Sequence, residues 1–316
     1  MRDDDSPPPT SPAPARRRPV AGAAVLAAVC LTAAGCGSGG ALPQAGPPAP
    51  DSASSAPPEP SASMSGSRSP SGPASPSTAP LPSATSAKAL PKGPLTGRTV
   101  VIDPGHNPGN REHTREINAQ VDIGTGRKEC DTTGTATDSG YAEARFTLDV
   151  SHTLRTLLEA EGAKVVLTQD GDRPFGPCVD ERARIGNEAR ADAVVSVHAD
   201  GSAAGNRGFH VILPAAVSGG GADTSKIVVP SRDLGERIAG KFVRATGSAP
   251  SNYIGGGTGL DTRNDLGGLN LSTVPKVFIE CGNMRDPKDA ALLTSEDWRQ
   301  RAAAGIAEGI GSFLAR

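Results

Sequence analysis

Three short apolar runs, rich in β-branched residues, each lead to a side chain that can bind a metal or carry a proton. These runs and side chains are Val100–Ile102 with His106, Ala193–Val197 with His198, and Val277–Ile279 with Glu280. Apolar runs of this length are typical of fully buried strands. Open α/β sheets place their chemistry at the carboxyl ends of such strands. The chain therefore predicts a buried sheet with polar residues gathered at one edge.

Segments with helical periodicity lie between the predicted strands. Phe146, Val150, Leu154 and Leu158 recur at helical spacing, and the helix they predict begins near Ser139 or Gly140 and stops at Gly162. The other expected elements are strands at Arg98–Ile102, Ala163–Thr168, Gly208–Leu213 and Pro275–Ile279, helices at Val179–Ala189, Leu234–Ala245 and Trp298–Leu314, and an irregular segment at Asn107–Asp138. This alternation favours a single α/β domain with a central, largely parallel mixed sheet flanked by helices. The helix Val179–Ala189 is expected to carry Arg182 on its solvent face.

The first hundred residues limit where this domain can lie, because Pro, Ser, Ala and Gly dominate them. Such a segment cannot bury enough apolar surface to offset its chain entropy, so we expect a disordered N-terminal third. The folded domain is accordingly predicted at 96–316. Residues 37–95 are predicted to form a disordered, extended tether rich in Pro, Ser and Ala.

Residues 1–36 have the order of a secretory signal. Arg16–Arg18 precede an apolar run, Val20–Ala34, which is short for a membrane span and ends in small residues. Ala33–Cys36 resembles the lipobox of bacterial lipoproteins, although its first position holds Ala where Leu is usual. We therefore expect an extracytoplasmic protein that is anchored to the outer face of the membrane through a lipid on Cys36. A secreted protein without the anchor is the alternative.

Charge and aromatic content argue against nucleic acid as a partner. The formal net charge is −2, which gives no electrostatic attraction to phosphates, and aromatic residues make up only 3% of the chain. We find no internal repeat and no second folded module, and we expect a monomer. Membrane contact is expected only through the lipid anchor.

Three cysteines remain outside the export segment. In oxidising surroundings Cys130 and Cys178 are the default disulfide pair, and the long loop that they close predicts a stabilisation of roughly 3–4 kcal/mol in the chain-entropy model. Cys281 follows a buried strand and is expected to be a packed free thiol. The sequence has no CxxC spacing, which argues against a zinc site built from cysteines.

A metal site can be assembled from residues at the predicted sheet edge. His106 and His198 follow apolar strands, and Glu143 lies in the first turn of the long helix, where carboxylates are favoured. Two histidines and a glutamate with an open fourth position are a known form of catalytic zinc. Glu280 would then be the general base that takes a proton from the attacking water.

Each of these residues also has a structural interpretation. A histidine after a strand is often a hydrogen-bonded structural residue. Glu143 would by itself favour the helix N-terminus by about 0.3–1 kcal/mol, and Glu280 could be a buried ion-pair partner. Among the other histidines, His113 and His152 are expected to face solvent. His210 lies within a predicted strand and is a weak candidate for substrate contact.

Four motifs carry a family resemblance: Ile102–His106, Glu143 before a Leu-rich helix, Ser196–Asp200, and Val277–Gly282. In this order they resemble the zinc-dependent N-acetylmuramoyl-L-alanine amidases of the amidase-3 family, and the resemblance covers essentially all of Thr99–Arg316. It implies a single α/β domain that acts on peptidoglycan or muropeptides. The bond cut would be the amide between N-acetylmuramic acid and the L-alanine of the stem peptide.

The resemblance also implies a role for each matching residue. One Zn²⁺ per chain would be held by His106, Glu143 and His198, with Glu280 as the catalytic acid/base. The residues alone leave the metal open, because two histidines and a glutamate tolerate other divalent ions.

Glu143 has competitors as the carboxylate ligand. Glu112, Glu116 and Glu129 lie in the irregular segment that precedes the long helix. Glu143 is preferred because Phe146–Leu148 and the following helix match the family's pattern after that ligand.

Two further residues are expected to contact substrate. Arg263 resembles an arginine near the family's substrate groove, and a surface salt bridge is its alternative. Asn107 directly follows the first predicted ligand, where the family usually has glycine. Gln169 stands where arginine is common, and Asp200 where asparagine is common. None of these departures removes a predicted ligand or the base, so they bear on substrate preference.

Two other functions fit parts of the sequence. A non-catalytic cell-wall-binding lipoprotein would be favoured by a missing ligand or base, and none is missing. A zinc peptidase or deacetylase would use the same site on another amide of peptidoglycan. Identification of the reaction products separates these functions from the amidase.

Overall fold

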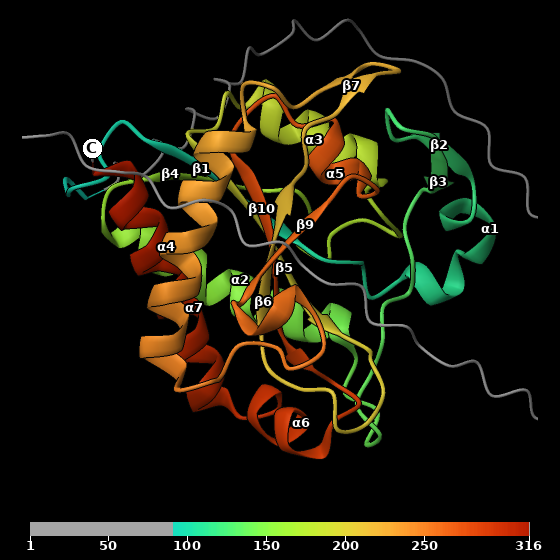
Figure 1. The fold of residues 1–316 in the computed structure, drawn as a ribbon, viewed down its shortest axis with the longest axis vertical. Helices are drawn as coiled ribbons and strands as arrows, with labels where there is room; N and C mark the ends of the chain where they lie inside the picture. The colour runs from blue at the N-terminus through green and yellow to red at the C-terminus, as the bar shows by residue number, and fades with distance from the viewer. Residues whose placement is uncertain (1–90, 316) are drawn as a thin grey trace, which may run out of the picture. The chain divides into compact units, whose positions relative to one another are not determined.

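The computed structural model describes residues 91–315 of the chain (Figure 1). The predicted export segment with Cys36, and the predicted tether as far as residue 90, lie outside the described residues. Within 91–315, Leu95 is buried in the core, so the folded segment includes residues before 96. None of the helices in this part combines the length and apolar composition that crossing a membrane requires.

A six-stranded sheet forms the centre of the domain, in the order β4-β1-β5-β10-β6-β9. Its strands are β1 (Thr99–Pro104), β4 (Lys164–Leu167), β5 (Ala193–Asp200), β6 (His210–Pro214), β9 (Leu260–Arg263) and β10 (Lys276–Asn283). Only the β10–β6 pair is antiparallel, which confirms the prediction of a largely parallel mixed sheet. Strand β9 was not predicted, because its sequence is short and mostly polar.

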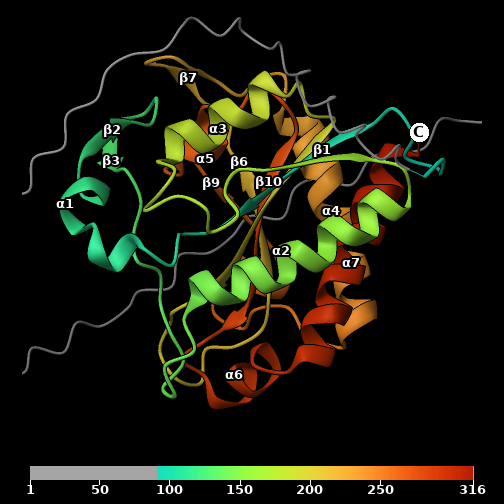
Figure 2. The ribbon, with the colours of Figure 1, turned by 180° about the vertical axis from the view of Figure 1, so that it is seen from behind.

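Helices cover both faces of the sheet (Figures 1 and 2). They are α1 (Thr114–Ile117), α2 (Glu143–Ala160), α3 (Val179–Glu188), α4 (Val228–Thr246), α5 (Gly267–Asn270), α6 (Pro287–Leu293) and α7 (Glu296–Leu314). The larger core lies under α2, α4 and α7, where Phe146 and Leu154 pack with Ile102 of β1. A smaller cluster that contains Val101 and Val194 lies toward α3.

Helices α4 and α7 begin earlier than their apolar periodicity predicts. The first turn of α4 carries Val229, which is 75% exposed, so no buried stripe marks that turn in the sequence. Helix α7 begins at Glu296, where the Ser295 side chain accepts a hydrogen bond from Trp298 N. A solvent-facing first turn therefore extends α4 beyond the part that packs on the sheet, and the Ser295 cap extends α7 in the same way.

The segment predicted to be irregular contains short elements of its own. They are η1 (Asn110–Glu112), α1, β2 (Gln120–Asp122) and β3 (Arg127–Glu129), with β2 and β3 forming an antiparallel pair. The structure confirms the Cys130–Cys178 disulfide, which ties this segment to the start of α3. Cys281 is a buried free thiol, as expected. Two further strands, β7 (Ser218–Gly219) and β8 (Ala222–Asp223), pair before α4, and η2 (Gly255–Gly257) precedes β9.

Candidate active site

The three predicted metal ligands lie together at the carboxyl edge of the sheet. His106 follows β1, His198 lies in β5, and Glu143 is the first residue of α2. Glu143 Oε1 lies 3.1 Å from His106 Nε2 and 3.0 Å from His198 Nδ1. One ligand atom from each residue falls within 4.8 Å of the others, so the three side chains can hold a single metal ion.

Backbone geometry at the end of β1 places His106 in this group. His106 has a φ of 61°, a left-handed conformation that non-glycine residues rarely adopt. Gly105 permits the close approach of the His198 ring, because a Cβ there would lie 2.3 Å from His198 Cε1. His106 Nδ1 lies 3.1 Å from Thr132 O and must donate its proton to that carbonyl. The remaining nitrogen, Nε2, is therefore free to act as a metal ligand.

Backbone donors fix the Glu143 carboxylate. The amide N–H of Thr135 donates to Oε2 at 3.0 Å, and that of Ala199 donates to Oε1 at 3.2 Å. The His198 ring is held from its other side by stacking on Phe278, with centroids 5.2 Å apart and an interplanar angle of 16°. Residues outside the ligand set thus orient the Glu143 carboxylate and the His198 imidazole.

The donor set fits a divalent metal ion. Two imidazole nitrogens and one carboxylate oxygen leave a fourth position open, as in catalytic zinc sites. Burial disfavours the charged form of His106, but Glu143 and Asp131 outweigh it and raise the pKa of His106 to about 10. The group therefore favours positive charge at this position, which a proton or a metal ion can supply.

Glu280 lies on β10 beside this group. It is paired in register with His198 on β5, and its Oε2 is buried with no hydrogen-bond partner among the described residues. Burial raises the pKa of Glu280 well above its usual value, and the negative charges of Glu143 and Asp200 raise it further. A carboxyl group with a raised pKa beside a metal site is suited to acid/base chemistry.

A buried ion network supports the end of β1. Asp103 accepts hydrogen bonds from Arg182 Nη1 at 2.8 Å, Thr168 Oγ1 at 2.7 Å, Lys276 Nζ at 3.0 Å and the Ser196 hydroxyl. Burial opposes the ionisation of Asp103, but the charges of Lys276 and Arg182 outweigh it and hold its pKa well below the usual range. The strand that leads to His106 is therefore fixed by two cations, from α3 and β10, and by two hydroxyl groups.

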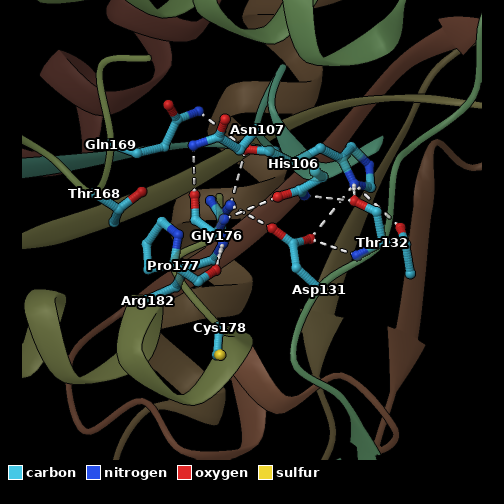
Figure 3. Close-up of polar contacts among 12 residues, drawn as sticks. His106, Asn107, Asp131, Thr132, Thr168, Gln169, Gly176, Pro177, Cys178 and Arg182 are labelled. Carbon is cyan, nitrogen blue, oxygen red and sulfur yellow. Dashed lines mark hydrogen bonds and ion pairs between the residues drawn. The ribbon is translucent and has the colours of Figure 1, made fainter. Parts of the chain in front are cut away.

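Arg182 connects this network to His106, one of the predicted metal ligands (Figure 3). Its Nη2 donates to His106 O at 2.9 Å and to Asp131 Oδ2 at 2.9 Å, and Asp131 Oδ1 lies 3.6 Å from His106 Nδ1. The prediction that Arg182 faces solvent is wrong, because the residue is only 4% exposed. Its burial depends on carboxylates that are distant in the sequence, so no local pattern signals it.

The predicted substrate contacts are engaged with neighbouring residues. Arg263 forms an ion pair with Asp265 through two hydrogen bonds of 2.8 and 2.7 Å. This agrees with the alternative prediction of a salt bridge for Arg263. Asn107 is 2% exposed, and its side chain bonds Arg173 O, Gly176 O and Gly109 N. The Asn107 side chain thus holds the loop together, and contact of either residue with substrate stays a prediction.

Two hollows lie near the predicted metal ligands. One, of about 220 Å³, is lined by both ligand histidines together with Lys128, Asp265 and Phe278. The other, of about 580 Å³, is lined by residues that include Arg111, Tyr141 and Arg145. Gly134 also lines the second hollow and lies against His106 and Glu143, since a Cβ there would come within 3.0 Å of both side chains.

The remaining histidines and glutamates lie outside the metal group. The side chains of His113 and His152 are 32% and 44% exposed, which agrees with their predicted solvent-facing positions. Within the described residues, the metal group contains Glu143 and none of its predicted competitors, which were Glu112, Glu116 and Glu129. His210 is buried on β6, in register with Glu280.

Comparison with known proteins relates this architecture to cell-wall amidases. The chain is 41% identical over 239 residues to the N-acetylmuramoyl-L-alanine amidase Rv3717 of Mycobacterium tuberculosis, with 74% of this chain and 93% of the relative covered. The crystal structure of the N-acetylmuramyl-L-alanine amidase Ami1 from Mycobacterium smegmatis is 40% identical, with a TM-score of 0.64, and covers 70% of this chain and 98% of that one. The apo form of Ami1 from Mycobacterium abscessus is also 40% identical, with a TM-score of 0.62 and coverages of 70% and 100%. Residues 100–312 match the N-acetylmuramoyl-L-alanine amidase family of amidase-3 type, and the chain therefore belongs to that family.

Proposed function

We propose that this protein is a zinc-dependent peptidoglycan hydrolase that cleaves the amide between N-acetylmuramic acid and the L-alanine of the stem peptide. The observation that carries the proposal is the convergence of His106, Glu143 and His198 at one sheet edge with Glu280 on the neighbouring strand. Family membership supports the same chemistry. Peptidoglycan and its muropeptides are accordingly the proposed substrates.

The protein's residues would share the reaction as follows. His106, Glu143 and His198 would hold one Zn²⁺, which when bound lowers the pKa of water and polarises a carbonyl group. Glu280 would take a proton from the attacking water, whose oxygen bonds to the lactyl carbonyl carbon. Glu280 would then return the proton to the leaving nitrogen as the C–N bond breaks. The products are a lactyl carboxylate on the sugar and a stem peptide with a free L-alanine amine.

We also propose that the enzyme works outside the cytoplasm, held to the membrane by a lipid on Cys36. The arrangement of residues 1–36 supports export, and the Cys130–Cys178 disulfide suits an oxidising compartment. Mass spectrometry of the mature N-terminus tests the anchor. A diacylated Cys36, and release of a Cys36→Ala variant into the medium, are expected; an unmodified mature N-terminus beyond residue 36 contradicts the anchor.

Product analysis tests the reaction itself. Zinc-loaded protein is incubated with purified muropeptides, and the products are identified by mass spectrometry, with Glu280→Gln as the inactive control. Release of the intact stem peptide with an N-terminal L-alanine is the expected result. Cleavage within the stem or loss of acetate would instead indicate a peptidase or deacetylase, and absence of any product would indicate a wall-binding protein.

A further inference from the structure

Strand register aligns three side chains that carry chemistry across the sheet. Glu280 of β10 is paired with His198 of β5 on one side and with His210 of β6 on the other. Paired residues on neighbouring strands project their side chains to the same face of the sheet. The row therefore contains a predicted metal ligand, the acid/base and a second imidazole.

His210 and Glu280 each contain a buried polar atom that lacks a partner. His210 is 2% exposed, and neither its Nδ1 nor Glu280 Oε2 has a hydrogen-bond partner within the described part of the chain. Native proteins leave few buried polar atoms unpaired. The two residues are directly opposed in an antiparallel pair, where Cβ atoms lie about 4.5–5.5 Å apart. The two atoms do not bond each other directly in this structure, so the contact that this pairing allows is one through a bridging water.

The contacts that hold the His210 ring in place do not involve its Nδ1. The Tyr253 ring packs edge-on against it, with centroids 6.1 Å apart and planes at 88°, and the Tyr253 hydroxyl is itself bonded to Asp200 Oδ2 at 2.5 Å. Burial lowers the pKa of His210 despite the nearby carboxylates of Asp200 and Asp261. A neutral imidazole carries one N–H donor and one acceptor nitrogen.

We propose that His210 is a positioning residue for Glu280, and that its Nδ1, through one bridging water, holds the Glu280 carboxyl in one orientation beside the predicted metal ligands. The proposal rests on the proposed function, in which Glu280 is the acid/base. His210 does not touch the reacting atoms. His210 keeps the proton-carrying oxygen of Glu280 close to the attacking water and to the leaving nitrogen.

Three substitutions at position 210 isolate the contribution of Nδ1. His210→Asn puts a polar atom near the place of Nδ1, His210→Gln puts one near Nε2, and His210→Leu keeps the volume without any polar atom. In the zinc-loaded full chain we expect His210→Leu to lower kcat roughly 10–100-fold, the range for loss of a supporting contact. KM and zinc per chain should stay unchanged. His210→Asn should restore most of kcat, and His210→Gln should not.

A neighbouring substitution controls for packing. Ile212→Val removes one buried methylene from the same face of β6, and it should leave kcat and KM near wild type. Three results would overturn the proposal: an unchanged kcat in His210→Leu, an equal loss in His210→Asn and His210→Leu, or a loss that appears only in KM or in zinc content.

A spectroscopic measurement decides the contact independently of activity. In zinc-loaded protein with ¹⁵N-labelled histidine, we expect the His210 Nδ1 resonance to shift in Glu280→Ala and to stay in place in Ile212→Val. An unshifted resonance in Glu280→Ala overturns the contact. If the wild type released no stem peptide, the proposed function would be wrong. This measurement would still show whether His210 and Glu280 interact.

Discussion

The guanidinium of Arg182 donates a hydrogen bond to the backbone carbonyl of His106 at 2.9 Å, so a buried cation on α3 holds the backbone of a predicted metal ligand. The same side chain is paired with Asp103 and Asp131. The left-handed backbone of His106 is therefore stabilised by contacts from outside the metal group. The geometry of the predicted ligands thus depends on side chains that are not part of the ligand set.

Replacing Arg182 should destabilise the fold and weaken metal binding together. Arg182→Met would leave two buried carboxylates, Asp103 and Asp131, without this partner, and loss of one member of a buried ion pair typically costs about 3–5 kcal/mol. Urea denaturation of the metal-free protein measures the change. The matched control is Arg184→Met, since Arg184 is 56% exposed on the same helix and should change stability by less than about 0.5 kcal/mol. Equal effects from both variants would contradict the role of Arg182.

Stability should fall in acid partly through Asp103. The charges of Lys276 and Arg182 outweigh burial and hold the pKa of Asp103 in the folded protein below its usual value of 3.8. A depressed folded pKa gives stability that is fully present above about pH 4 and is lost as the pH falls further. Asp103→Asn should therefore be less stable at pH 7. Below pH 4 its free energy of unfolding should decline less steeply than in wild type, by up to about 1.4 kcal/mol per pH unit. Parallel declines in the two proteins would exclude this contribution.

The disulfide should stabilise the domain by closing a long loop. Cys130 and Cys178 are 48 residues apart, and the chain-entropy model gives about 4 kcal/mol for a loop of this length. The double variant Cys130→Ser with Cys178→Ser should lose stability of that order in chemical denaturation. Addition of a reductant should lower the stability of wild type but not of the double variant. A reductant effect that persists in the double variant would show that the disulfide is not its cause.

The sequence predicts those residues of the site that follow the ends of strands. It is a weaker guide to which charged residues are buried. Runs of β-branched residues identify β1, β5 and β10, and parallel strands share a carboxyl edge, so His106, His198 and Glu280 were expected near one another. Burial of Arg182 depends on Asp103 and Asp131, which lie 79 and 51 residues away and have no local signal.

The same limit applies to two other features. Strand β9 is mostly polar and lies at the sheet edge, and its pairing with β6 comes only from the tertiary fold. His210 lay within a predicted strand, but its opposition to Glu280 required the antiparallel register of β6 with β10. Local patterns define elements, whereas register and buried charge pairs are set by long-range contacts.

Zinc content and turnover, measured together on the same preparations, test the central claim most directly. Wild type should contain one zinc per chain and release stem peptide from muropeptides. Glu280→Gln should keep its zinc and lose at least about 100-fold in kcat, whereas His106→Ala should lose both zinc and activity. Near-normal turnover by Glu280→Gln, or full zinc content in His106→Ala, would contradict the assignment of these residues.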